Sequence, residues 1–244
     1  MRVKATVSYD GSGYYGWQSQ ANVVGIQDII EDALSKMHKE KKHIAASGRT
    51  DRGVHALGQV FHFDTELSLT EEQWVKALNS NLPMDIRILK TEFVDAEFHS
   101  RFSAKKKRYD YYLNMGEYNL FERNTVTQYN RQLDVDKMRE AASILVGTHD
   151  FTSFCSNSFE ETPNQVRTIE TLNISREMDR LQFTFIGDGF LRYMVRMIVG
   201  VLIQVGENKL EIADVKAILE AKSKEVIRYK AEANGLYLTE VNYY

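Results

Sequence analysis

Residues 46–56 read ASGRTDRGVHA and form a polar, glycine-bearing loop between more apolar flanks. Asp51 lies in this loop between Arg49 and Arg52. A neighbouring guanidinium stabilises an ionised carboxylate and lowers its pKa, and an ionised aspartate can act as a nucleophile or base without a metal ion. The alternative is a turn in which Asp51 accepts local backbone hydrogen bonds while both arginines are solvated. The loop therefore offers one candidate catalytic carboxylate, with a structural turn as the competing interpretation.

The hydrophobic pattern on either side of this loop has the periods of strands and helices. Strands are expected at residues 3–9, 59–64, 86–93, 109–113, 168–176, 181–187 and 235–241, and helices at 25–38, 69–78 (with Thr70 as N-cap), 136–146, 190–205 and 211–221. Because strands and helices do not alternate strictly, the pattern indicates an α+β fold with largely antiparallel pairing. The order of elements is similar in the two halves, so we expect an N-terminal α+β half, 1–103, that carries the loop, and a C-terminal α+β half, 104–244.

Composition is that of a folded chain with a sizeable core. The 244 residues are 43% hydrophobic and 27% charged. A chain of this length and composition can bury enough apolar surface to be stable without disulfides or structural metals. Cys155 is the one cysteine, so no intramolecular disulfide can form, and this favours a reducing compartment. The N-terminus lacks the apolar core of a signal peptide, and residues 190–205 are too short and too charged to span a bilayer. We therefore expect a cytoplasmic protein with no membrane contact.

Charge is close to balanced overall but uneven along the chain. A net charge of −3 excludes a histone-like positive coat, yet nucleic-acid binding depends on local charge. Residues 101–109, RFSAKKKRY, hold five cations and no acid, and supply the candidate nucleic-acid contacts Arg101, Lys105, Lys106, Lys107 and Arg108. The alternative is a solvated lysine run. Arg192, a further candidate nucleic-acid contact, and Arg196 are expected on one face of the 190–205 helix, where they either reach into a cleft or only snorkel to solvent.

Residues 11–16, GSGYYG, spell G-x-G-x-x-G directly after a strand. This pattern binds dinucleotides only where a helix opens at the same turn, and the polar residues 17–22 give no helical signal. A nucleotide-dependent oxidoreductase would rest on this pattern alone. We interpret it as a surface loop whose aromatic and amide side chains, Gln18 among them, can contact a nucleic acid.

Other catalytic chemistries lack their sequence motifs. The six histidines form no H-E-x-x-H or paired Cys/His pattern, and there is no G-x-S-x-G nucleophile elbow. Cys155 has no local signature of a reactive thiol. We therefore expect neither a metal nor a cofactor.

The loop around Asp51 resembles the signature of the tRNA pseudouridine synthase A (TruA) family, in the pattern S-G-R-T-D-x-G-V-H-A. Further blocks that resemble this family follow in order along the whole chain: Tyr9-Asp10-Gly11 with Tyr14, Gly16, Trp17 and Gln18; FHSRFSA at 98–104; RYDY at 108–111; MVRMIVG at 194–200; and AEANGLYL at 231–238. The resemblance implies a cofactor-independent isomerase that converts uridine to pseudouridine in tRNA, at positions 38, 39 and 40 of the anticodon stem-loop.

The resemblance also implies roles for single residues. Asp51 matches the family's catalytic aspartate, although attack on the ribose, addition to the base and removal of a ribose proton all stay open. Arg49 matches an arginine that displaces the target base, Tyr109 a tyrosine that packs against the uridine, and Arg196 a basic residue that pairs with the aspartate. Arg52 stands where the family commonly has alanine, and we expect it to point to solvent or phosphate.

The architecture implied is the pseudouridine synthase fold, with two related halves similar to ferredoxin-like or RRM-like domains. We expect their sheets to join into one mixed, mostly antiparallel sheet, with flanking helices and a central cleft. The implied assembly is a homodimer in which one tRNA touches both subunits, and the apolar surface of the 190–205 helix could serve subunit contact. A non-catalytic RNA-binding module or chaperone with this fold is the rival interpretation from another functional class.

Overall fold

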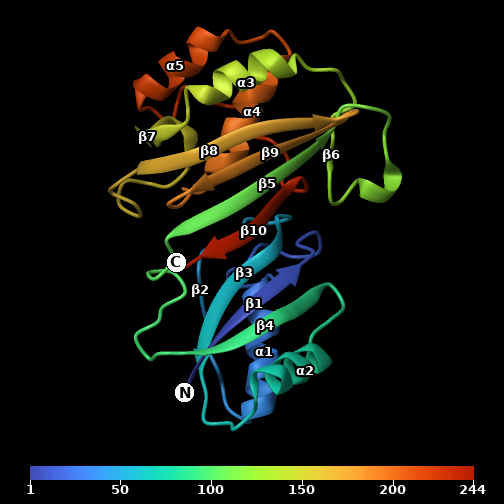
Figure 1. Ribbon diagram of the computed structural model, residues 1–244, viewed down its shortest axis with the longest axis vertical. Coiled ribbons are helices and arrows are strands. Elements are labelled where there is room, and N and C mark those ends of the chain that lie inside the picture. The colour runs from blue at the N-terminus through green and yellow to red at the C-terminus, as the bar shows by residue number, and fades with distance from the viewer. The chain divides into compact units, whose positions relative to one another are not determined.

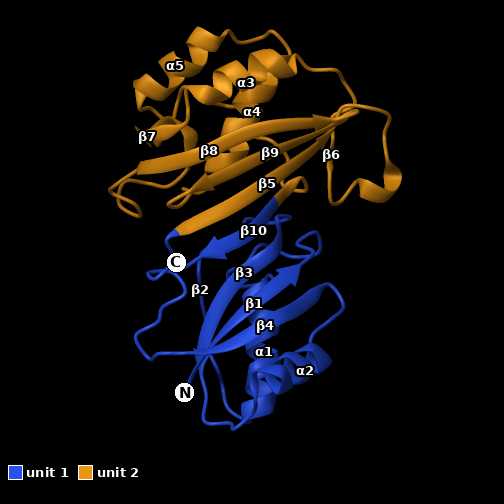
Figure 2. Cartoon of the chain, viewed as in Figure 1, with its two compact units in different colours: residues 1–105, 237–244 blue, residues 106–236 orange.

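The computed structural model describes residues 1–244, which fall into two compact units (Figures 1 and 2). Unit 1 holds residues 1–105 and 237–244, and unit 2 holds residues 106–236. Each unit combines a mostly antiparallel sheet with helices, so the expected α+β class is confirmed. The expected boundary between the two halves at residues 103 and 104 stays a prediction. Residues 237–244, which hold most of the last strand, belong to the same compact unit as the N-terminal residues.

Unit 1 is built on a sheet in the order β4-β1-β3-β10, and the short strand β2 pairs with β3. All neighbours are antiparallel except β3 and β10, which run parallel. The strands are β1 (Arg2–Tyr9), β2 (Ala45–Ala46), β3 (His55–Asp64), β4 (Ile86–Val94) and β10 (Leu236–Asn242), and the helices are α1 (Ile26–His38) and α2 (Glu71–Asn81).

The core of unit 1 is formed by the apolar face of β1 and by β3, which is buried along most of its length. Val3, Ala5 and Val7 are completely buried, as the alternation in the sequence predicts. Phe63 on β3 meets Trp74 of α2 edge to face, with ring centroids 5.1 Å apart, so α2 covers this face of the sheet. The expected cap of α2 is confirmed, because Thr70 accepts a hydrogen bond from the backbone of Gln73.

Unit 2 repeats the theme with strand order β5-β9-β8-β7, and the short strand β6 pairs parallel to β5. The pairs β5–β9, β8–β9 and β7–β8 are antiparallel. The strands are β5 (Lys106–Asn114), β6 (Thr127–Gln128), β7 (Gly147–Asp150), β8 (Val166–Glu177) and β9 (Arg180–Gly187); the helices are α3 (Val135–Ser143), α4 (Met194–Gly206) and α5 (Ile212–Ala221), with 3-10 turns η1 (Leu120–Glu122) and η2 (Thr152–Phe154).

Helix α4 corrects two expectations. It begins at Met194 rather than at residue 190, because Tyr193 adopts a left-handed conformation with φ 65° and stops the helix there. Arg192 therefore precedes the helix and does not share a helical face with Arg196. Twelve of the thirteen residues of α4 are buried. No apolar surplus is left on this helix for a second subunit, so the expected use of its surface was wrong.

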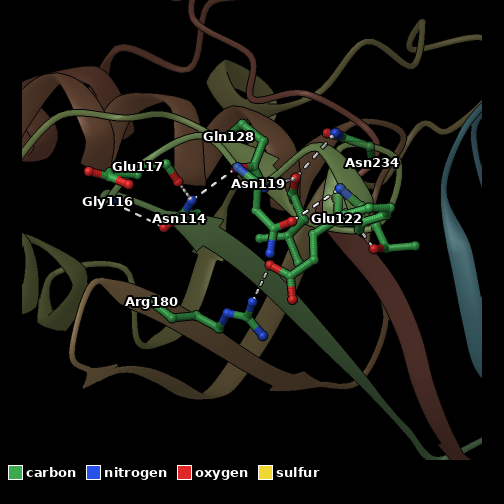
Figure 3. A network of polar contacts seen from close by, with 11 residues as sticks. Asn114, Gly116, Glu117, Asn119, Glu122, Gln128, Arg180 and Asn234 are labelled. Carbon is green, nitrogen blue, oxygen red and sulfur yellow. Dashed lines mark hydrogen bonds and ion pairs between the residues drawn. The ribbon is translucent and has the colours of Figure 1, made fainter.

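Residues 114–128 leave β5, pass through η1 and return to β6, and a polar network holds their path (Figure 3). The side-chain amide of Asn114 donates to Glu117 O at 2.7 Å and to Gln128 Oε1 at 2.9 Å. Arg180 on β9 forms an ion pair with Glu122. Because these bonds are made by residues outside the hydrophobic pattern, the periodicity of the sequence predicts no structure between 114 and 135.

Candidate functional site

The start of the loop around Asp51 is hydrogen-bonded to β3. The backbone N–H of Ser47 donates to Val60 O at 2.8 Å, and its hydroxyl donates to Gln59 Oε1 at 2.6 Å. The same Gln59 donates from Nε2 to Gly48 O at 3.0 Å. Ser47 and Gln59 are completely buried, so each of these bonds replaces water that cannot enter. The start of the loop is therefore fixed in register with the sheet.

Thr50, the residue before Asp51, is held at both its side chain and its carbonyl. Its hydroxyl shares a buried hydrogen bond of 2.8 Å with the hydroxyl of Tyr9, at the end of β1. Its carbonyl oxygen accepts from the backbone N–H of Trp17 at 3.0 Å. Burial raises the pKa of the Tyr9 hydroxyl above its ordinary value, so Tyr9 stays neutral and keeps its hydrogen-bonding role.

A sharp turn then begins at Asp51 itself. The backbone N–H of Val54 donates to Asp51 O at 3.1 Å, and Gly53 takes φ 77°, a conformation that a glycine adopts without strain. The side chain of Asp51 is half-buried, whereas Val54 and His55 behind it are buried. Both the approach to Asp51 and the exit from it are thus fixed by backbone hydrogen bonds.

The glycine pattern at 11–16 supports this loop and opens no helix, since α1 begins only at Ile26. A Cβ on Gly11 would lie 2.0 Å from Val54 O, so only a glycine lets the two segments meet. The backbone N–H of Gly11 donates to Nδ1 of His55 at 3.1 Å. The ring of His55, 1% exposed, stacks on Tyr237 of β10 with centroids 4.7 Å apart. The geometry required of a dinucleotide fingerprint is absent, and the pattern is accounted for by packing.

The two arginines beside Asp51 differ in their surroundings. Arg49 is exposed, as a residue that must enter a nucleic acid would need to be. Arg52 is exposed and its guanidinium lies over the ring of Tyr15, 4.2 Å from the centroid. The expectation that Arg52 points outward is therefore confirmed, and its charge is engaged by an aromatic face.

Tyr109 and Arg196 both belong to unit 2. Tyr109 on β5 is 9% exposed and meets Phe190 edge to face at a centroid distance of 5.2 Å. Arg196 on α4 is 8% exposed, and its Nε donates to Ala231 O at 2.8 Å while Ala231 N–H donates back to Arg196 O at 2.9 Å. Both side chains are thus held in place by their own unit. Their approach to Asp51, which lies in unit 1, stays a prediction.

The basic run is less free than the sequence suggests. Lys106 forms an ion pair with Glu170 at 2.7 Å, and Arg108 pairs with Asp110 at 2.9 Å. The buried Asp110 also accepts a hydrogen bond from Thr184, which ties the pair to the sheet.

Three other candidate contacts have no acidic partner of this kind. Arg101 is exposed beside Phe102, with its guanidinium 5.8 Å from the ring centroid, and Lys105 is exposed at the end of unit 1. Gln18 lies half-exposed in the loop before α1. Contact of these residues with RNA, like that of Lys107, stays a prediction.

The sequence pattern assigns no structural role to the residues that hold the loop, namely Tyr9, Thr50, Trp17, Gln59 and His55. Their signal was indirect: Gly11 and Gly16 lie where a side chain would collide with the loop. In addition, no group of three or more His, Cys, Asp or Glu side chains is arranged to hold a metal ion. None of the helices has the length and apolar character needed to cross a membrane.

Comparison with known proteins gives a consistent result over the full chain. A family model described as tRNA pseudouridine synthase matches residues 5–103 and 141–244. A protein from Bacillus pumilus named tRNA pseudouridine synthase A is 49% identical over 246 aligned residues, covering 100% of this chain and 99% of its own. Proteins of the same name from Bacillus licheniformis and Bacillus subtilis are each 46% identical with the same coverage.

Proposed function

This chain belongs to the tRNA pseudouridine synthase family, and we propose that it acts on uridines 38, 39 and 40 of the anticodon stem-loop with Asp51 as the catalytic carboxylate. The family reaction, which the chain carries out, isomerises uridine to pseudouridine in tRNA. The N1–C1′ bond breaks, a C5–C1′ bond forms, C5 gives up its hydrogen, and N1 carries a hydrogen in the product. Atoms and electrons balance without a cofactor or a second substrate.

The observation that carries the proposal is the fixed position of the residue before Asp51. Thr50 is bonded through its hydroxyl to Tyr9 and through its carbonyl to Trp17, and Asp51 O closes the turn onto Val54. A carboxylate held in this way needs little reorganisation to reach the atom with which it reacts. Such positioning lowers the activation barrier by several kcal/mol, of the order of 7–11 in well-oriented intramolecular reactions. The alternative, in which Asp51 belongs to a solvated surface turn, does not require the residue before it to be held by buried hydrogen bonds.

The remaining site residues have roles that their chemistry supports. Extraction of a stacked uridine costs a few kcal/mol, and the exposed Arg49, two residues from Asp51, has the length and planar head to occupy the vacated space. We assign Tyr109 to packing against the uridine and Arg196 to pairing with Asp51. We propose further that the active species is a homodimer that contacts one tRNA with both subunits.

The experiment compares Asp51→Asn with wild type on tRNA labelled with tritium at uridine C5. We expect release of tritium to fall by at least a thousandfold, while affinity for tRNA stays within about threefold. Asp32→Asn, on the exposed side of α1, is the matched control because it removes one carboxylate from the same unit. Release by Asp51→Asn at the wild-type rate would refute the proposal and leave the non-catalytic RNA-binding rival standing.

A further inference from the structure

A second cationic surface lies in unit 2, outside the basic run at 101–108. The segment 222–230, KSKEVIRYK, follows α5 and holds four cations against one acid, Glu225. It runs beside the start of α4, because Ala231 N–H donates to Arg196 O and a Cβ on Gly200 would lie 2.9 Å from Lys230 N. Two stretches far apart in sequence thus bring their positive charges together.

The ring of Tyr193 is the centre of this surface. The Nζ of Lys230 lies 4.2 Å from its centroid, and the guanidinium carbons of Arg192 and Arg196 lie at 5.0 and 5.5 Å. Each cation gains about 0.5–2 kcal/mol from such a ring, yet Arg192 and Lys230, two like charges at the same ring, also repel one another. The arrangement gains most when an anion joins it.

Asn157 extends the surface to a further cation. Its side-chain oxygen accepts from the backbone N–H of Arg192 at 2.8 Å, and its carbonyl accepts from Nζ of Lys224. The same Lys224 lies 4.7 Å from the ring centroid of Phe159, which is 57% exposed. Arg192 and Lys230 thus contact the ring of Tyr193, while Arg192 and Lys224 are both hydrogen-bonded to Asn157.

These three cations differ from the basic run in having no carboxylate within ion-pair distance. Lys106 and Arg108 are compensated by Glu170 and Asp110, whereas Arg192, Lys224 and Lys230 form no ion pair. Glu160 and Glu161 are near in sequence to Phe159, but neither pairs with a cation of this surface. The surface therefore keeps its full positive charge for an external anion.

The backbone of Tyr193 points to the same conclusion. A left-handed conformation costs a bulky residue of the order of 1–3 kcal/mol and persists only where the surroundings impose it. Tyr193 takes φ 65°, and its ring lies within 5.5 Å of Arg192, Arg196 and Lys230. A glycine or asparagine would make this turn with less strain but would supply no ring.

We propose that Arg192, Lys224 and Lys230, arranged by Asn157 and the ring of Tyr193, form a binding surface for two to three consecutive phosphates of the tRNA backbone. The inference rests on the proposed function for the identity of the polyanion. Guanidinium and ammonium groups bind phosphate oxygens through charge-assisted hydrogen bonds, and the contacts are independent of base sequence. The surface supplies affinity and register, and Arg196 behind it stays directed by its bond to Ala231.

The test measures the affinity of full-length unmodified tRNA transcript as a function of salt concentration. Each phosphate contact contributes about 0.7–0.9 to the slope of log K against log[salt]. The triple variant R192Q/K224Q/K230Q should lower the slope by about 1.5–2.5, which corresponds to a loss of about 30- to 300-fold in affinity at 0.1 M salt. The single variants K224Q and K230Q should each lower the slope by about 0.7–0.9.

The matched control is K36Q/K90Q/K209Q, which removes the same number of charges from lysines that are already paired with Asp32, Glu92 and Glu207. Its slope should stay within about 0.3 of wild type. An unchanged slope in the triple variant, or an equal fall in the control, would overturn the inference. Absence of tRNA binding by the wild-type protein would instead overturn the proposed function, so the two failures are distinct.

The role of the ring is tested by Tyr193→Phe and Tyr193→Leu in the same salt series. Both residues bear the same backbone strain, so they differ chiefly in the π face offered to the cations. Tyr193→Phe should keep the wild-type slope, whereas Tyr193→Leu should lose about half of the effect seen in the triple variant. Equal slopes for the two variants would contradict the role of the ring as an organiser of the surface.

Discussion

Addition of one methyl group at Gly16, in Gly16→Ala, should lower the activity of the protein without preventing its folding. It has φ 91°, and a Cβ there would lie 2.7 Å from Thr50 O and 3.1 Å from Asp51 C. An ordinary contact begins at 3.4 Å, so Thr50 must move by roughly 0.7 Å, the difference between 3.4 and 2.7. Such a shift strains the bond from Trp17 N–H to Thr50 O, now 3.0 Å long, and carries Asp51 with it.

The magnitude follows from these two costs. The backbone conformation alone costs a non-glycine residue of the order of 1–3 kcal/mol, which lowers Tm by about 2–12 °C in a chain of this length. A misplacement approaching 1 Å at a catalytic group costs up to about 100-fold in rate. We therefore expect Gly16→Ala to fold, to bind tRNA and to release tritium on the order of 10- to 100-fold more slowly.

The assay pairs Gly16→Ala with Gly13→Ala in the same loop. A Cβ on Gly13 meets nothing within 4 Å, so that variant should match wild type in both Tm and rate. Single-turnover tritium release at saturating enzyme isolates the catalytic step from binding. Equal rates for Gly16→Ala and Gly13→Ala would refute the claim that this close approach positions Asp51.

Three further outcomes follow from single residues. Burial lowers the pKa of His62 to about 4, so the unfolded chain binds more protons than the folded one below pH 6.5. The free energy of unfolding should therefore fall as the pH is lowered from about 6.5 to 4, by up to about 1.4 kcal/mol per pH unit. His62→Gln should reduce this pH dependence in urea unfolding, and an unchanged pH dependence would contradict the assignment. Arg52→Ala should change the free energy of unfolding by less than about 1 kcal/mol and leave the pH profile of tritium release unchanged, because the guanidinium of Arg52 lies over the ring of Tyr15. A shifted pH profile would mean that Arg52 tunes Asp51. Tyr109→Phe should retain more single-turnover activity than Tyr109→Ala if packing on the uridine dominates, and equal losses would assign the role to the hydroxyl.

The long elements were predictable because each carries a complete hydrophobic period. β1, α1, α2, β8 and β9 appear within a few residues of their expected bounds, and Thr70 caps α2 as its hydroxyl and position predict. The short strands β2, β6 and β7 were not predicted, since two to four residues are too few to show a period. The start of α4 was misplaced because apolar spacing does not report the left-handed backbone of Tyr193.

The site was predictable only in its chemistry. The resemblance of the Asp51 loop to a family signature identified the carboxylate, but the contacts that hold it come from segments separated by about 40 residues, as in the bond between Tyr9 and Thr50. The partners of the basic run were hidden for the same reason. Lys106 on β5 meets Glu170 on β8, with β9 between the two strands, and no local pattern signals an ion pair across 64 positions.

The most direct test of the central claim maps pseudouridine along a full-length tRNA transcript that carries uridines at 38, 39 and 40 and elsewhere. The transcript is incubated in parallel with wild-type protein and with Asp51→Asn, and the modified positions are read by chemical probing and primer extension. We expect wild type to convert uridines at 38, 39 and 40 and no others, and Asp51→Asn to convert none. Conversion by Asp51→Asn at the wild-type level, or conversion by wild type only outside these positions, would contradict the account.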